Sequence, residues 1–255
     1  MVTYYLACRK KVYEMKGKRQ VTSLHILIGF IFLMMFSIIG WGVYTENNWI
    51  ETFDLWVIDV IQSNITGAKT AVISVLTEVG NIRLVVVLTI FLCLILFWKK
   101  WYAMGLWLGG TVLFCAAILT KGLKKVFDRE RPDILPLLEK TTESFPSGHA
   151  TASTIFYGFL ALMLILLMKK LWNQLIVGFV TLVLIGFILI TRIYLGVHYP
   201  TDVLAGSLYG FAVVFFSVGL YLMMVEPLQR GLRRLGLRDQ SETFREDVVI
   251  KRHSF

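Results

Sequence analysis

The chain has 255 residues, of which 56% are hydrophobic and only 17% charged, and its mean hydropathy is +0.69. Soluble domains have roughly a quarter of their residues charged, so this composition excludes an ordinary soluble globular protein. The net charge of +9 does not indicate nucleic-acid binding. The basic residues cluster at the ends of apolar stretches, where they favour contact with anionic lipid headgroups.

Six apolar stretches are long enough, or nearly so, to cross a bilayer as helices. In chain order they are 24–44, 83–98, 102–120, 150–168, 171–191 and 203–225. We therefore predict an all-α integral membrane bundle of six transmembrane helices over residues 24–225, between basic tails at 1–23 and 226–255. The first stretch follows a basic run, as a signal peptide would, but it is long for one and no small-residue cleavage site follows it. We expect a retained span.

The segment 46–69 is acidic and has apolar residues at helical spacing, which predicts a short helix lying on the membrane surface. Glu78 and Arg83 then interrupt the start of the second span. An ionisable residue at membrane depth is a functional candidate, but we favour structural pairing or interfacial exposure near the outer end of this span. The cysteines form no disulfide framework, since Cys8 lies in the first tail and Cys93 and Cys115 lie inside spans.

The distribution of Lys and Arg predicts the orientation. With the N-terminus in the cytoplasm, the basic turns at 99–100 and 169–170 and the C-terminal tail all fall inside, as the positive-inside rule requires. We therefore expect a multi-pass protein of the cell membrane with both termini cytoplasmic. The charged loop 121–148 and the connector 192–202 would then lie outside. They are two crossings apart, so they share a face in either orientation.

Three clusters of polar residues meet on that face. Lys124 and Arg131 are seven residues apart, which would place them on one helical face before Pro132 ends the run. Ser147-Gly148-His149 stands where a long apolar stretch begins, and Ser147 is a natural N-cap for a helix there. The free N–H groups and the positive dipole end of such a helix make an anion site. The third cluster comprises Arg192, His198 and Asp202.

This combination of cations, a helix N-terminus, two histidines and one carboxylate suits phosphoryl transfer. Lys124, Arg131 and Arg192 would bind the non-bridging oxygens of a phosphate and neutralise the charge of the transition state. One histidine can attack phosphorus, and the other can protonate the departing alkoxide and then activate water. A carboxylate four residues after a histidine can fix its tautomer and favour its cationic form.

Three alternatives compete with this interpretation. Metal catalysis would need several carboxylates or three to four clustered ligands, whereas here cations that would repel a metal outnumber two histidines and one acid, so we expect no metal and no cofactor. The basic residues could instead merely mark the membrane interface, but that does not explain why three of them accompany both histidines. A transporter or scramblase usually places its ionisable residues near the midplane, and here the interiors of the third to sixth spans lack charge.

The same residues resemble the signatures of the type 2 phosphatidic acid phosphatase superfamily. The stretch from Lys124 to Arg131-Pro132 is similar to the first signature, Pro146-Ser147-Gly148-His149 to the second, and Thr191-Arg192 through His198 to Asp202 to the third. Thr191 stands where serine is common, and the hydroxyl is kept. The matching region, 121–202, does not extend to the first two spans or the tails.

The resemblance implies a six-helix phosphatase that acts on lipid phosphates without metal. It also implies the roles of the residues: His198 as nucleophile, Asp202 as its partner and His149 as general acid, with phosphate bound by Lys124, Arg131, Ser147, Gly148 and Arg192. We expect a site at the outer face and a substrate such as undecaprenyl pyrophosphate, phosphatidylglycerol phosphate or phosphatidic acid. A lipid phosphotransferase is the enzymatic alternative, since an acceptor other than water could capture a phosphohistidine.

Overall fold

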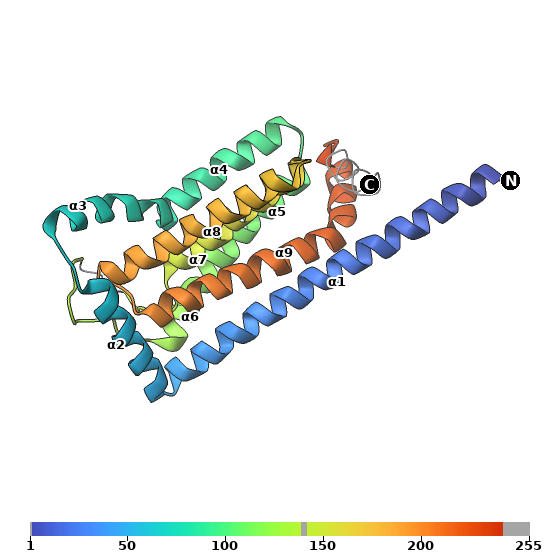
Figure 1. The fold of residues 1–255 in the computed structure, drawn as a ribbon. Coiled ribbons are helices and arrows are strands. Elements are labelled where there is room, and N and C mark those ends of the chain that lie inside the picture. The colour runs from blue at the N-terminus through green and yellow to red at the C-terminus, as the bar shows by residue number, and fades with distance from the viewer. Residues whose placement is uncertain (1, 139–141, 242–255) are drawn as a thin grey trace.

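The computed structural model describes residues 2–138 and 142–241, and the regular structure in these residues is entirely helical (Figure 1). The all-α class is therefore confirmed. The elements in chain order are α1 (Val2–Tyr44), α2 (Asn48–Gln62), α3 (Gly67–Leu76), η1 (Thr77–Gly80), α4 (Ile82–Trp98), α5 (Tyr102–Thr111), η2 (Val112–Leu119), α6 (Thr120–Phe127), α7 (Gly148–Leu167), α8 (Leu171–Tyr194) and α9 (Pro200–Arg234).

Five helical segments of the described chain are long and apolar enough to cross a membrane. They are 19–44, 102–127, 148–165, 171–194 and 200–234. A further span results if 67–80 and 82–98, which meet at a bend of 43°, are counted as one. The total of six spans stays a prediction.

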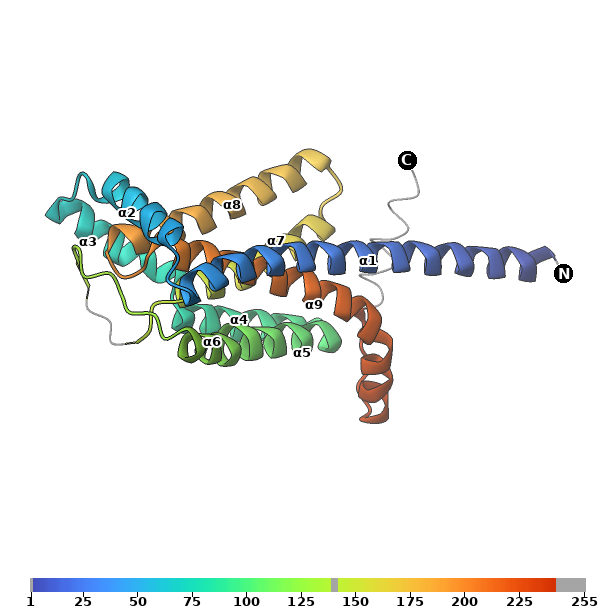
Figure 2. The same ribbon diagram turned by 90° about the horizontal axis from the view of Figure 1, so that it is seen from below.

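The first and last helices extend beyond the predicted spans. Helix α1 begins at Val2, so the segment expected as an N-terminal tail is continuous with the first helix. Helix α9 runs on to Arg234, and Figure 2 shows it bending near its C-terminal end. Pro227 lies inside this helix, where a proline removes a backbone hydrogen bond and produces a kink. Residues 242–255 of the predicted C-terminal tail lie outside the described residues.

Helix α2 lies in the segment 46–69, for which one short helix was predicted, and α3 begins at the end of that segment. Helix α2 begins after Asn47, whose side chain accepts a hydrogen bond from the N–H of Trp49. It buries every fourth residue: Ile50, Asp54, Ile58 and Gln62. Helix α3 was not predicted. The amide of Gln62 donates to the carbonyls of Ile193 and Tyr194, both at 3.2 Å, and so ties α2 to the end of α8.

Helices α7 and α9 cross closely because the contact consists of small residues. A Cβ added to Gly210 would lie 2.6 Å from the Cβ of Thr154, and one added to Gly206 would lie 2.7 Å from the carbonyl oxygen of Ser147. Any side chain at either glycine would therefore push the helices apart, as at small-residue crossings in membrane bundles. This crossing brings the N-terminus of α9, with Asp202, against the N-terminus of α7.

Candidate active site

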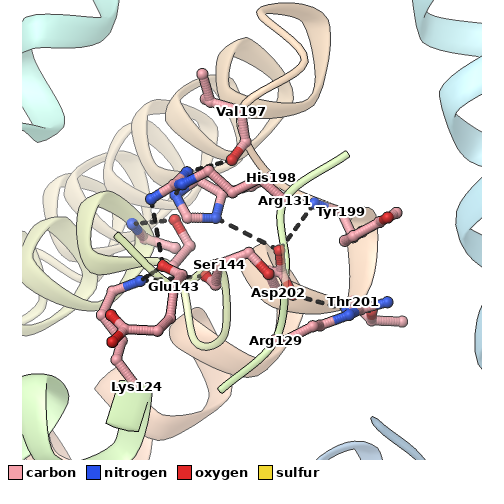
Figure 3. Close-up of polar contacts among 12 residues, drawn as sticks. Lys124, Arg129, Arg131, Glu143, Ser144, Val197, His198, Tyr199, Thr201 and Asp202 are labelled. Atoms are coloured by element: carbon pink, nitrogen blue, oxygen red, sulfur yellow. Dashed lines mark hydrogen bonds and ion pairs between the residues drawn. The ribbon is translucent and has the colours of Figure 1, made fainter. Parts of the chain in front are cut away.

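The charged loop before α7 and the connector between α8 and α9 lie side by side, as the alternation of spans predicted. Backbone hydrogen bonds join them: the N–H of Leu137 donates to the carbonyl of Leu195 at 3.1 Å, and that of Ser147 to the carbonyl of Asp202 at 3.0 Å. Figure 3 shows side chains from both segments turned toward one another around His198 and Asp202. The convergence of the two segments is confirmed.

One local prediction is wrong: Lys124 and Arg131 do not share a helical face. Helix α6 ends at Phe127, and Asp128 follows in the left-handed conformation with φ of 44°. Its N–H closes the last turn on the carbonyl of Lys124 at 2.9 Å. Aspartate tolerates this conformation better than most residues, so the helix stops before Pro132 requires it to. Arg131 then approaches from irregular chain.

Lys124 and Arg131 nevertheless reach the same short segment, 142–144. The ammonium group of Lys124 donates to the carbonyls of Glu143 and Ser144. The Nε of Arg131 donates to the carbonyl of Thr142 at 2.7 Å, and its Nη1 donates to the carbonyl of Val197 and lies 3.4 Å from Nε2 of His198. Both cations are therefore held by backbone carbonyls beside the histidine.

Arg192 comes from the last turn of α8 and is 2% exposed. Its Nη1 donates to the hydroxyl of Thr77 at 3.1 Å, while its buried Nε has no hydrogen-bond partner among the described residues. In the part of the chain that the structure describes, neither Arg192 nor Lys124 nor Arg131 forms an ion pair. A buried cation without an ion-pair partner is costly, and a bound anion would offset that cost at Arg192.

The N-terminus of α7 lies at the same place. Ser147 is fully buried and is the N-cap of this helix, as predicted, with its hydroxyl accepting from the N–H of Ala150 at 3.5 Å. A Cβ added to Gly148 would meet nothing within 4 Å, so packing within the protein does not require glycine there. His149 is the second residue of α7 and is partly buried.

His198 and Asp202 form a buried pair at the start of α9. Nδ1 of His198 lies 3.4 Å from Oδ2 of Asp202, and the same oxygen accepts from the N–H of Tyr199 at 2.9 Å. Burial lowers the pKa of His198 well below its ordinary value, and the positive charges of Arg131, Arg192 and Lys124 lower it further. The imidazole is therefore neutral at physiological pH, the form in which a histidine is a nucleophile.

A model of the PAP2 superfamily matches residues 104–224, which include all three clusters. This part of the chain is similar to the PAP2 superfamily. The resemblance seen in the sequence motifs is thereby confirmed. It had been inferred from motifs that contain Lys124, Arg131, Arg192 and two histidines.

Two curated proteins that are similar to this chain are named as phosphatases. Phosphatidylglycerophosphatase B of Bacillus subtilis (strain 168) is 39% identical over 106 residues, which are 40% of this chain and 51% of the relative. Lipid A 1-phosphatase of Rhizobium johnstonii is 32% identical over 149 residues, 51% of this chain and 57% of the relative. The chain thus spans about half the length of the curated relatives that it matches.

A solved structure supports the same assignment. The crystal structure described as the first transmembrane PAP2 type phosphatidylglycerolphosphate phosphatase, from Bacillus subtilis, superposes with a TM-score of 0.67 at 26% identity. The superposition covers 75% of this chain and 94% of that one. The chain is therefore a multi-pass helical membrane protein with a similar fold.

Four polar residues at the candidate site were not predicted. Thr77, in η1, contacts Arg192, and Asp54, Arg129 and Thr201 form a hydrogen-bonded cluster behind Asp202. Arg129 lies between the motif residues Lys124 and Arg131, and its position in the sequence did not indicate a role. Asp54 lies four residues from Ile50 and from Ile58 on the buried face of α2, and an acidic residue on that face was a signal that could have been used. Glu78, by contrast, is exposed and accepts a hydrogen bond from Asn81 at 2.6 Å, in keeping with a structural role.

Among the described residues, no group of three His, Cys, Asp or Glu side chains gathers as metal ligands would. The two carboxylates near His198, Asp54 and Asp202, are both engaged by Arg129. That the chemistry needs no metal stays a prediction.

Proposed function

We propose that this protein is a phosphatase of membrane lipid phosphates or pyrophosphates that works without metal through a phosphohistidine at His198. One observation carries the proposal: the buried Arg192 and the partly buried Lys124 and Arg131, none of which forms an ion pair among the described residues, lie around the buried, neutral His198. Such a cluster would bind a phosphate dianion and favour the transition state, in which charge spreads over the non-bridging oxygens.

The first half-reaction transfers the phosphoryl group to the protein. Nε2 of His198 attacks phosphorus, the N–P bond forms, and the bond from phosphorus to the lipid oxygen breaks. His149 donates its proton to the departing oxygen. Asp202 faces Nδ1 of His198 and stabilises the cationic phosphoimidazole. Lys124, Arg131 and Arg192 would hold the non-bridging oxygens, together with the N-terminus of α7 at Ser147 and Gly148.

The second half-reaction restores the enzyme. His149, now neutral, takes a proton from water while the water oxygen attacks phosphorus and the N–P bond breaks. The products are inorganic phosphate and regenerated His198, and the lipid has left as an alcohol, or as a monophosphate when the substrate was a pyrophosphate. A second lipid in place of water would give the phosphotransferase reaction.

The location proposed for this chemistry is the outer face of the cell membrane. The proposal comprises six spans with both termini cytoplasmic, the basic turns at 99–100 and 169–170 inside, and α2 lying along the outer surface. Its support is the distribution of Lys and Arg, together with the exposed Trp49 and Trp56 on α2, since tryptophan favours the membrane interface. Domain limits of 24–225 for the catalytic unit, with tails at 1–23 and 226–255, belong to the same proposal.

The names of the relatives favour a lipid with a phosphate or pyrophosphate headgroup as substrate. We include phosphatidylglycerol phosphate, phosphatidic acid and undecaprenyl pyrophosphate, and add a lipid A type 1-phosphate because of the matched lipid A 1-phosphatase. Headgroup choice depends on the shape of the pocket around the phosphate, which the cations that bind phosphate do not specify.

The test is release of inorganic phosphate from each of these lipids in detergent micelles, by purified protein in the presence of EDTA. We expect release by the wild type and a loss of at least about a thousandfold in His198→Ala, the scale expected when a nucleophile is removed. Activity that EDTA abolishes and added divalent metal restores would contradict the metal-free mechanism. A His198→Ala variant that keeps a tenth of the activity would contradict the assignment of the nucleophile.

A further inference from the structure

A guanidinium group joins two buried carboxylates directly behind the proposed nucleophile. Nη1 of Arg129 donates to Oδ1 of Asp202 at 2.7 Å, and Nη2 donates to Oδ2 of Asp54, also at 2.7 Å (Figure 3 shows the contact with Asp202). Asp202 and Asp54 are 0% and 1% exposed, respectively. The guanidinium also lies over the ring of Tyr199, 4.0 Å from its centre. Arg129 is therefore fixed from three sides.

Asp54 comes from a different part of the chain, the outer helix α2. Its two carboxylate oxygens accept from the N–H and the hydroxyl of Thr201, each at 2.8 Å, in addition to Arg129. Thr201 is the residue before Asp202 at the start of α9. Asp54 thus holds both the backbone beside Asp202 and the cation that binds Asp202.

The two carboxylate oxygens of Asp202 have different partners. Oδ1 is taken by Arg129, while Oδ2 accepts from the N–H of Tyr199 and faces Nδ1 of His198 at 3.4 Å. A carboxylate held at both oxygens cannot rotate about its terminal bond. The oxygen that faces the histidine is therefore the one that Arg129 leaves open, so the position of this oxygen relative to Nδ1 of His198 depends on Arg129.

Stability alone does not account for this arrangement. Replacing a buried ion pair by apolar residues of similar volume is often neutral or stabilising, so a buried carboxylate–guanidinium–carboxylate cluster is weak evidence of a contribution to folding. Arginine suits the position because its planar, permanently charged fork can bind two carboxylates at once, which a lysine ammonium cannot do with the same geometry.

We propose that Asp54 and Arg129 are positioning residues that act through Asp202 to orient His198, so that helix α2 is part of the active site. The inference rests on the proposed role of His198 as nucleophile. Neither side chain contacts the three phosphate-binding cations through a hydrogen bond in the described residues, so neither is expected to bind substrate. Their loss should slow the phosphoryl transfer step and leave the affinity for the lipid unchanged.

The test compares Asp54→Asn, Arg129→Lys and the double variant with wild type, using phosphatidic acid in detergent micelles. A misplacement of about 1 Å at a reacting group costs about a hundredfold, so we expect kcat to fall about a hundredfold in Arg129→Lys and about tenfold in Asp54→Asn, with KM within twofold of wild type. Because Asp54 acts through Arg129, the double variant should be no slower than Arg129→Lys within about threefold.

The matched control is Asp59→Asn, which removes an exposed carboxylate from the same helix and should leave kcat unchanged. Asp54→Glu is a second variant that keeps the charge but displaces the carboxylate, and we expect it to lower kcat in the same way. It replaces Asp54→Asn in the test if Asp54→Asn does not fold. Size-exclusion profiles and thermal unfolding midpoints identify variants that are folded.

The outcomes separate this inference from the function on which it rests. Folded Asp54→Asn and Asp54→Glu with the kcat of Asp59→Asn would overturn the inference alone, as would a change confined to KM. Losses that multiply to about a thousandfold in the double variant would mean that the two residues act independently, which also overturns it. Wild-type protein that releases no phosphate from any lipid tested would overturn the proposed function together with the inference.

Discussion

Thr77 offers a sensitive probe of the cations that we propose to bind phosphate, because its hydroxyl is the only described hydrogen-bond partner of the buried Arg192 guanidinium. The hydroxyl lies 3.1 Å from Nη1 of Arg192 and 2.9 Å from the hydroxyl of Thr191, and Thr77 is fully buried. Valine has nearly the same shape as threonine, so Thr77→Val removes the contacts of the hydroxyl with Arg192 and Thr191 and changes the packing little.

The size of the effect follows from the charge on the donor. A hydrogen bond to a charged group contributes about 1.5–3 kcal/mol, and 1.4 kcal/mol corresponds to a factor of ten. If Thr77 holds Arg192 against the phosphate, Thr77→Val should lower kcat/KM by about 10- to 100-fold. Inorganic phosphate, which would use the same cations, should become a weaker competitive inhibitor by a similar factor.

The assay is steady-state release of phosphate from phosphatidic acid, with inorganic phosphate as inhibitor. Thr89→Val is the matched control, since Thr89 is also a buried threonine but donates only to the carbonyl of Val85 within its own helix. We expect the control to retain wild-type kcat/KM. Equal losses in the two variants, or a change of less than twofold in Thr77→Val, would refute the role given to Thr77 and Arg192.

Three further expectations concern the histidines and the orientation. In single-turnover experiments, His149→Ala should slow phosphorylation more for a lipid phosphate than for an activated aryl phosphate, whose leaving group needs little protonation, and equal slowing would exclude the acid role. Since the pKa of His198 is depressed by burial and by nearby cations, folding opposes its protonation, and stability should fall as pH drops below 6.5. The thermal midpoint of His198→Gln should therefore fall less between pH 7 and pH 5 than that of wild type, and parallel curves would contradict the depressed pKa. Asp133→Cys, in a background without the native cysteines, should react with a membrane-impermeant thiol reagent in intact cells, and labelling only after lysis would invert the topology.

Sequence pattern was sufficient wherever a single physical rule decided the structure. Long apolar stretches predicted the helices, and Ser147 before such a stretch predicted an N-cap that the structure contains. The meeting of the two polar segments followed from counting crossings. Each of these inferences depends on local composition or on topology, both of which the sequence carries directly.

The failures arose where local conformation or distant contacts decided the structure. Spacing of seven residues suggested a helix through Arg131, but Asp128 adopts the left-handed conformation and ends α6 at Phe127. Asp54 seemed one of several acids in an outer segment, because its partners Arg129 and Thr201 are 75 and 147 residues away. Spacing within a motif cannot reveal a contact of that range.

The central claim, a covalent phosphohistidine at His198, is tested most directly by capturing it. Purified protein in EDTA would be mixed with a lipid phosphate carrying a radioactive phosphoryl group, quenched with alkali within milliseconds, and digested into peptides. We expect label that is stable to alkali and labile to acid, on the peptide containing His198, and none on the His198→Ala protein. Label on another residue, or turnover of substrate at a normal rate with no labelled protein at any time, would contradict the account.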